Sequence, residues 1–297
     1  MGREEREAMS GARGTRTIVR AGCATLARLA FEAYEAGRTA VLVAASRAAL
    51  AELEAYARLF CADLSLADPN PACPLWERPL VTIPQGLLVR EEQMDWPRRL
   101  AALYALTTQG PHIVVASVES LVLRLPPKDF FAGASVDLAP NATFPPEELL
   151  GRLDTLGYTR VPMVTRPGEM ARRGDIVDVF ASGFRHPLRI EFFDDTIEEL
   201  RLFDEQTQRS LQSLDEATIL PASPWLRTPE VQASFSARLE KLAKSGSISS
   251  DIAYDCHKAL EQGGRTLLPG SVCEHTSLLE DWLPKDTLYL CAGEEAT

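Results

Sequence analysis

A GK[ST] triplet is missing from the 297-residue sequence, and none of its five lysines precedes Lys128. A nucleotide-binding P-loop needs a lysine that reaches the terminal phosphates, and arginine replaces it poorly because the loop selects a compact ammonium group. Lysine is scarce throughout, since 31 basic residues minus these five leaves 26 arginines. These absences argue against catalytic ATP binding by Gly22 and the predicted strand and helix on either side of it.

Closely spaced cysteines and long apolar runs are also missing. The six cysteines contain no CxxC pair, and no run approaches the roughly 18 apolar residues of a membrane span. A signal-peptide apolar region is absent as well. We therefore expect reduced thiols, a cytoplasmic protein and no membrane partner. The net charge of −11 argues against a protein whose main task is to neutralise nucleic-acid phosphates.

Alternating strands and helices characterise the first part of the chain. The pattern predicts strands at 15–19, 39–46 and 112–117 and helices at 21–37, 47–60 and 93–108. Such alternation is typical of a parallel sheet covered by helices. A further strand at 287–292 can rejoin this sheet. Residues 1–135 and 221–297 are therefore predicted to be two parts of one α/β domain.

Composition changes between residues 136 and 220. A helix that ends near residue 158 precedes four strand-like segments, at 161–165, 174–181, 187–194 and 197–203. This order predicts an inserted α+β domain with an antiparallel sheet. The segment holds 16 acidic and 9 basic residues, a net charge of −7. Arginine-rich spots in an acidic domain suit a specific acidic protein surface better than a DNA backbone.

Candidate metal and nucleotide motifs elsewhere are weak. The acidic strand ends at 200–207 and 214–218 resemble a Walker B motif, but no phosphate cradle accompanies them. Two Cys and two His residues near the C-terminus fit no zinc template, because adjacent ligands are awkward for one tetrahedral ion: Cys256, His257, Cys273 and His275. Buried cysteines and surface histidines are the favoured interpretation. We expect no catalytic residue, no cofactor and no metal.

The stretch "RRGDIVDVFASGFRHPLRIEFFDD" (172–195) reads as two strands joined by a loop. Period-two alternation places Arg189, Glu191 and Phe193 on one face of the second strand. If the strands pair antiparallel, the end that carries Arg173 lies close to Phe193. Arginine and aromatic residues are enriched at binding hot spots, which favours a contact surface. A cross-strand ladder of arginines and carboxylates, with Phe193 half exposed, explains the pattern equally well.

These residues carry a family resemblance that covers essentially the whole chain. "ARRGDIVDVF", "PLRIEFFDDTIEELRLFDEQTQRS" and "ILPA" are similar to the domain shared by the excision-repair helicase UvrB and the bacterial transcription-repair coupling factor (Mfd). The flank "GCATLARLAFEAYEAGRTAVLVAAS" resembles the ATP-incompetent counterpart of the UvrB helicase domain in the coupling factor. "ERPLVTIPQGLLVREEQMDWPRRLAALYAL" resembles the coupling factor too, which lacks the damage-gripping hairpin of UvrB.

The resemblance implies a fold and a partner. It implies a degenerate RecA-like (P-loop NTPase-type) parallel-sheet domain with an inserted small α+β domain like domain 2 of UvrB. The inserted domain is the UvrA-binding domain of the family. The family's contact residues correspond here to Arg173, Arg189 and Phe193.

The remaining family partners fall outside this sequence. RNA polymerase and DNA are expected to be bound only through regions absent here, along with other domains of a longer coupling factor. The sequence is therefore expected to be the N-terminal fragment of a larger protein and a non-catalytic adaptor that recruits UvrA to stalled transcription complexes. The alternative is a UvrB-like helicase fragment that binds nucleotide or damaged DNA.

Overall fold

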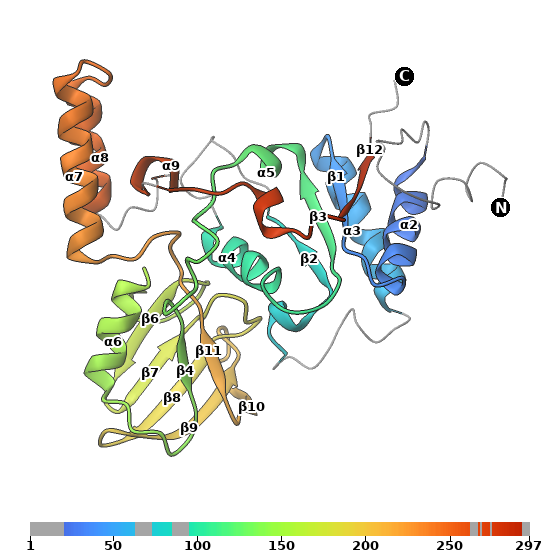
Figure 1. Ribbon diagram of the computed structural model, residues 1–297. Helices are drawn as coiled ribbons and strands as arrows, with labels where there is room; N and C mark the ends of the chain where they lie inside the picture. The colour runs from blue at the N-terminus through green and yellow to red at the C-terminus, as the bar shows by residue number, and fades with distance from the viewer. Residues whose placement is uncertain are drawn as a thin grey trace.

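A computed structural model describes residues 21–62, 73–84, 95–261, 267, 269–273 and 275–292. A parallel sheet with its helices and a separate antiparallel sheet make up most of the chain (Figure 1). The mixed α/β class predicted from the sequence is thus confirmed in outline. The predicted strand at 15–19 lies outside the described residues.

Four parallel strands form the first sheet. Their order is β12 (Leu288–Ala292), β1 (Ala40–Ala44), β3 (Ile113–Ser117) and β2 (Leu80–Thr82). The helices of this part are α2 (Cys23–Glu35), α3 (Arg47–Ala62), α4 (Trp96–Ala105) and α5 (Val118–Val122), and two short 3-10 helices are Leu75–Glu77 and Leu279–Trp282. Strand β12 pairs with β1, which confirms the prediction that the C-terminal strand rejoins the first sheet.

Both faces of this sheet are buried, which explains its continuous apolar strands. Leu42 of β1 packs in a cluster with residues of α2 and α3, whereas its neighbours Val41 and Val43 pack in a second cluster with residues of α4. Strand β2 was not among the strands predicted from the sequence. It is a three-residue edge strand between Pro79 and Pro84, too short to show a period.

The second sheet has six strands. Their order is β10 (Ser210–Ser213), β9 (Thr196–Phe203), β8 (Leu188–Phe193), β7 (Ile176–Val179), β6 (Glu169–Arg173) and β5 (Thr159–Arg160). All neighbours are antiparallel except β5 and β6. Helix α6 (Pro146–Thr155) lies against one face of the sheet (Figure 1).

Two strand predictions in this region were wrong. Residues 161–165 form a connecting segment and no strand, because Pro162 and Pro167 interrupt the ladder there. The two arginines that open the quoted stretch belong to a separate strand, β6, so residues 172–195 span parts of three strands. Gly174 and Asp175 form the turn between β6 and β7, which makes the "GD" pair a hairpin turn.

The two ends of the segment 136–220 lie side by side. Strand β4 (Val136–Leu138) pairs antiparallel with β11 (Ala217–Ile219), and Val136 lies opposite Ile219. The buried Tyr158 hydroxyl connects two neighbouring backbone segments: it donates to the Leu220 carbonyl at 2.7 Å and accepts from the Ser182 N–H at 3.1 Å. Burial raises the pKa of Tyr158 to about 12.

One hydrophobic cluster runs from the parallel sheet to the inner side of the antiparallel sheet. Trp76 lies at the junction and meets Phe184 edge to face, with ring centroids 5.5 Å apart. The Leu75 N–H donates to the Gly183 carbonyl at 2.9 Å. Gly183 has φ +88°, and a Cβ there would lie 2.4 Å from the Trp76 ring. The close approach therefore requires glycine.

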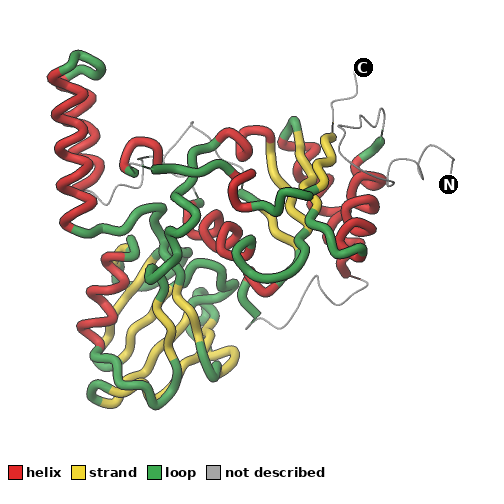
Figure 2. The backbone as a smooth tube through the Cα atoms, in the orientation of Figure 1, coloured by secondary structure: helices red, strands yellow, loops and turns green. Residues whose placement is uncertain are grey.

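Helices α7 (Pro229–Lys244) and α8 (Ser250–Glu261) form an antiparallel hairpin that projects from the body (Figure 2). The Thr228 hydroxyl caps α7 by accepting from the Val231 N–H at 3.3 Å. A small cluster around Trp225 and Phe235 anchors the hairpin beside α9 (Pro269–Val272). Within the described ranges, no helix has the length and apolar character needed to cross a membrane.

Candidate functional site

Among the residues that the structure describes, no helix covers one face of the antiparallel sheet. Helix α6 packs on the inner face, where Leu149 and Leu153 join a cluster with Val177 and Ile190. We call the opposite side the outer face. Side chains directly across from each other in an antiparallel pair share a face. Two cross-strand rows on the outer face follow from the register: Arg173, Ile176, Glu191 and Glu199 in the first, and Ala171, Asp178, Arg189 and Arg201 in the second.

Phe193 is the most exposed large apolar side chain in the described part of the chain, at 71%. It ends β8 and lies opposite Thr196. A two-residue turn follows, in which Asp194 adopts φ +53°. The ladder is irregular between Glu191 and Phe192. Exposure of an aromatic ring costs hydrophobic free energy, and a partner that covers it recovers that free energy.

Arg173 lies at the same end of the sheet as Phe193. It is opposite Ile176, which in turn is opposite Glu191, two residues before Phe193. The predicted antiparallel pairing of the two strands is therefore confirmed. The Arg173 side chain is exposed and donates one hydrogen bond, from Nη2 to the Pro162 carbonyl at 3.2 Å. Ile176, which the sequence interpretation did not single out, is half-buried between them.

Arg189 is held more firmly than Arg173. Its Nε and Nη2 donate to the two carboxylate oxygens of Asp178 at 2.7 and 2.8 Å, and Nη2 also lies 3.3 Å from Gln208 Oε1. The guanidinium carbon lies 4.3 Å from the centroid of the Phe203 ring. The Arg189 side chain is only 16% exposed. Hydrogen bonding to Asp178 raises the pKa of Arg189.

The outer face thus contains features of both interpretations of the sequence, the contact surface and the cross-strand ladder of arginines and carboxylates. Arg201 pairs with Glu191 and Glu199, so a ladder of arginines and carboxylates crosses the sheet beside the Asp178 pair. The exposed Phe193 is the feature that a plain ladder does not require. Asp178 was missed in the sequence, although an aspartate within the apolar run "DIVDVF" is a signal for a buried ion pair.

The far end of the outer face is covered by the segment 161–168. Val164 of this segment packs on Ala171 and Phe203. The Glu169 carboxylate accepts from the backbone N–H groups of Thr165 and Arg166 at 2.8 and 3.2 Å. Burial raises the pKa of Glu169, but these hydrogen bonds outweigh burial and the net pKa is lowered. We call the end with Phe193 and Arg173, where both side chains are exposed, the open end of this face.

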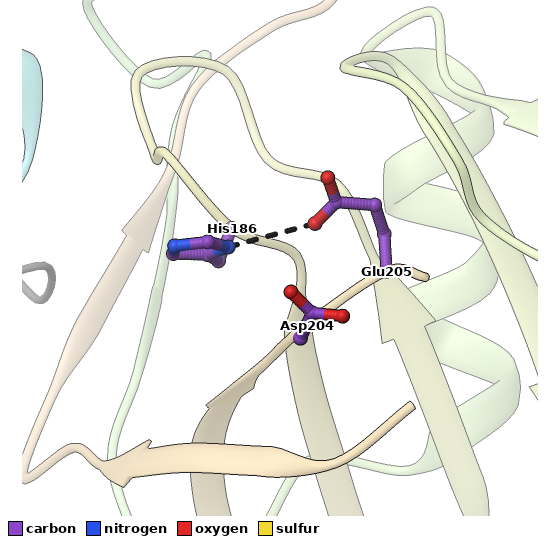
Figure 3. A group of neighbouring side chains, drawn as sticks. All are labelled: His186, Asp204 and Glu205. Carbon is purple, nitrogen blue, oxygen red and sulfur yellow. Dashed lines mark ion pairs between the residues drawn. The ribbon is translucent and has the colours of Figure 1, made fainter. Parts of the chain in front are cut away.

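Polar contacts fix the turn between β9 and β10, which lies beside Arg189. His186, Asp204 and Glu205 point toward one another (Figure 3), and His186 Nδ1 lies 3.5 Å from Glu205 Oε2. Asp204 Oδ1 accepts from the backbone N–H groups of Gln206 and Thr207 at 3.1 and 2.6 Å. The hydrogen bonds with Thr207 lower the pKa of Asp204. These contacts fix the turn between β9 and β10, which carries Gln208.

The C-terminal Cys and His residues lie elsewhere. Cys273 Sγ lies 3.9 Å from the Pro224 carbonyl, and His257 Nδ1 lies 3.5 Å from the Ser236 hydroxyl. Burial raises the pKa of the Cys273 thiol, which favours the neutral form. Over the described residues, Cys256, His257, Cys273 and His275 do not bring three ligand atoms to metal-binding distance.

Comparisons with known proteins identify the region that carries the outer face. Residues 136–225 match the family described as the UvrB interaction domain. The transcription-repair-coupling factor of Escherichia coli K12 is 36% identical over 124 residues, which is 42% of this chain and 11% of that protein. The Myxococcus xanthus coupling factor is 33% identical over 210 residues, or 65% of this chain and 17% of that protein.

UvrABC system protein B of Kosmotoga olearia is 30% identical over 197 residues, which is 66% of this chain and 28% of that protein. The chain spans less than a fifth of the length of the two coupling factors above. The family resemblance seen in the sequence is confirmed by these matches. The chain is therefore a homologue of the transcription-repair-coupling factors and carries a UvrB interaction domain over residues 136–225.

Proposed function

We propose that this chain is a non-catalytic adaptor of nucleotide excision repair that binds UvrA through the open end of the outer face. The observation that carries the proposal is the 71% exposure of Phe193 within the segment matched to the UvrB interaction domain. Through this contact the chain recruits UvrA to stalled transcription complexes. Residues Arg173, Arg189 and Phe193 are the proposed contacts.

The chemistry of the open end fits a protein partner. Phe193 offers apolar area, and Arg173 offers a guanidinium whose single intramolecular acceptor is the Pro162 carbonyl among the described residues. Aromatic and arginine side chains contribute strongly at interface centres. Carboxylates surround them, including Asp194 and Asp195 in the adjacent turn. An acidic rim of this kind repels a nucleic-acid backbone and leaves a protein surface as the better partner.

We propose that the parallel-sheet part serves as a scaffold and is a degenerate RecA-like domain. An all-parallel, helix-covered sheet supports this proposal. The helix that follows Gly22 begins at Cys23, and the chain has no lysine before Lys128 that could reach a phosphate. Without that lysine, binding and hydrolysis of ATP by this part are not expected.

The alternative function is a UvrB-like helicase fragment that binds nucleotide or damaged DNA. The 30% identity to UvrABC system protein B is the observation that favours it. Thermal unfolding with and without ATP and Mg²⁺ distinguishes the two functions. A ligand that binds at a hundred times its Kd stabilises the folded state by about 2.7 kcal/mol, so a clear rise in Tm would support the alternative.

Truncation of Phe193 tests the proposed function. We expect Phe193→Ala to weaken binding to purified UvrA by about 2 kcal/mol, roughly thirtyfold, because the ring loses its apolar contact at the interface. Calorimetric titration of UvrA with each variant measures the loss. Tyr254→Ala is the matched control, since Tyr254 on α8 is an aromatic with a similar exposure of 68%. Equal affinity of wild type and Phe193→Ala would refute the proposed site.

A further inference from the structure

Arg189 differs from Arg173 and Phe193, whose side chains are exposed, because an ion pair with Asp178 already holds its mostly buried guanidinium. Its side chain is 16% exposed, and that of its partner Asp178 is 4% exposed. We propose that Asp178 is a positioning residue, which, together with Gln208, fixes the guanidinium of Arg189 so that its Nη1 group faces UvrA. The inference rests on the proposed function and deepens it.

Asp178 holds the guanidinium at two points. The hydrogen bonds from Nε and Nη2 to the two carboxylate oxygens are 2.7 and 2.8 Å long, a side-on bidentate pair that fixes both position and plane. The Phe203 ring lies against the guanidinium, 4.3 Å from its central carbon. An arginine immobilised before binding loses little rotamer entropy when a partner arrives, which favours affinity.

The contacts leave one part of the guanidinium without an acceptor. Asp178 and Gln208 accept from Nε and Nη2, whereas Nη1 has no hydrogen-bond acceptor among the residues that the structure describes. Nη1 is also not one of the unpaired side-chain atoms that are removed from solvent in this part of the chain. Nη1 therefore keeps some contact with solvent. A carboxylate or backbone carbonyl on UvrA is the complementary acceptor.

Gln208 supports the arrangement as a second acceptor for Nη2. Its side-chain oxygen lies 3.3 Å from Arg189 Nη2, and its Nε2 donates to the Glu205 carbonyl at 2.9 Å. Its backbone adopts φ +59°, a conformation that a residue other than glycine rarely takes. The turn keeps this conformation through the Asp204 cap and the contact between His186 and Glu205. The turn between β9 and β10 thus acts as part of the support of Arg189.

A competing interpretation makes the opposite prediction. Asp178 neutralises the charge of Arg189, so it could compete with a carboxylate of UvrA for the same guanidinium. In that case the loss of the Asp178 charge would strengthen the binding of UvrA. The positioning role requires weaker binding instead. The two interpretations therefore differ in the sign of the effect of one substitution.

A double-mutant cycle tests the positioning role. Calorimetry would give the UvrA affinity of the wild-type chain, Asp178→Asn, Arg189→Ala and the double variant. We expect Asp178→Asn to weaken binding about tenfold in the wild-type background and to have no further effect once Arg189 is alanine. The same weakening in both backgrounds, or tighter binding of Asp178→Asn, would overturn the inference. A wild-type chain that fails to bind UvrA would instead overturn the proposed function itself.

Two further measurements separate positioning from general stability. Gln208→Ala alters a half-buried turn residue and is expected to fold normally while it weakens binding about threefold. The Nε–H of Arg189, observed by ¹⁵N NMR, is expected to exchange slowly in the wild type and rapidly in Asp178→Asn. If Asp178→Asn does not fold, unchanged affinity of Gln208→Ala and rapid exchange in the wild type would still contradict the inference.

Discussion

Replacement of Arg189 by alanine is expected to lower the free energy of unfolding by about 3–5 kcal/mol. The substitution leaves the Asp178 carboxylate, whose side chain is 4% exposed, without its ion-pair partner. Removal of one member of a buried pair costs this much because an uncompensated charge stays in a poorly hydrated site. Arg189→Ala also removes the guanidinium that lies against Phe203. Urea denaturation of the wild-type chain and of Arg189→Ala measures the difference in the free energy of unfolding.

Arg201→Ala is the matched control for this substitution. Arg201 also belongs to the ladder on the outer face, but its partners Glu191 and Glu199 have side chains that are 25% and 39% exposed. Water can solvate these carboxylates after the arginine is removed, so a loss of about 1 kcal/mol or less is expected. Similar losses for the two variants would contradict the buried character of the Asp178 pair.

This prediction affects how a binding experiment is read. A variant that lowers stability by several kcal/mol populates unfolded chains and lowers apparent affinity without any role in the interface. Loss of UvrA binding by Arg189→Ala is therefore informative only under conditions in which the variant is folded. Phe193, which is exposed, does not carry this complication.

Gly183→Ala is expected to destabilise the chain by about 3 kcal/mol. Part of the cost, roughly 1–2 kcal/mol, comes from an L-residue at φ +88°. The remainder comes from overpacking, since the new Cβ would lie 2.4 Å from the Trp76 ring and 3.1 Å from Ala101 Cβ. Trp76 is buried and contacts Phe184 and Tyr104 edge to face, so it has little room to move. Thermal and urea unfolding would report the loss.

Gly174→Ala separates the two contributions. Gly174 also has a positive φ of +62°, but no heavy atom lies within 4 Å of its hypothetical Cβ. Only the backbone cost of about 1 kcal/mol is expected there. If both glycine variants lose the same free energy, the close packing of Trp76 against Gly183 does not contribute to stability, and the contact between the two sheets is looser than described.

The parallel sheet could be predicted from the sequence because its strands are buried on both faces. The runs 40–45 and 113–116 are apolar throughout, and helices separate them, so the composition of the strands and the order of the elements both indicate the architecture. Strands β2, β4 and β11 were not predicted. Each has three residues, which is too few for a period to show, and each is defined by its neighbour across the sheet.

The candidate site could be predicted in part. Alternation along "PLRIEFF" separates Arg189, Glu191 and Phe193 from the inward residues, and this arrangement holds in the structure. The ion pair could not be derived in the same way. It depends on the register that brings Asp178 opposite Arg189 and on the turn that carries Gln208 to them. Such contacts between strands are set by tertiary structure, which period-two alternation does not encode.

The central claim is that Phe193 contacts UvrA, and photo-crosslinking at this position tests it most directly. The photoreactive amino acid p-benzoyl-phenylalanine would replace Phe193 in one variant and Tyr254 in another, because both sites are aromatic and exposed. We expect irradiation with UvrA to yield a covalent product from position 193 and none from position 254. Binding of UvrA without a crosslink from position 193, or with equal crosslinks from both positions, would contradict the account.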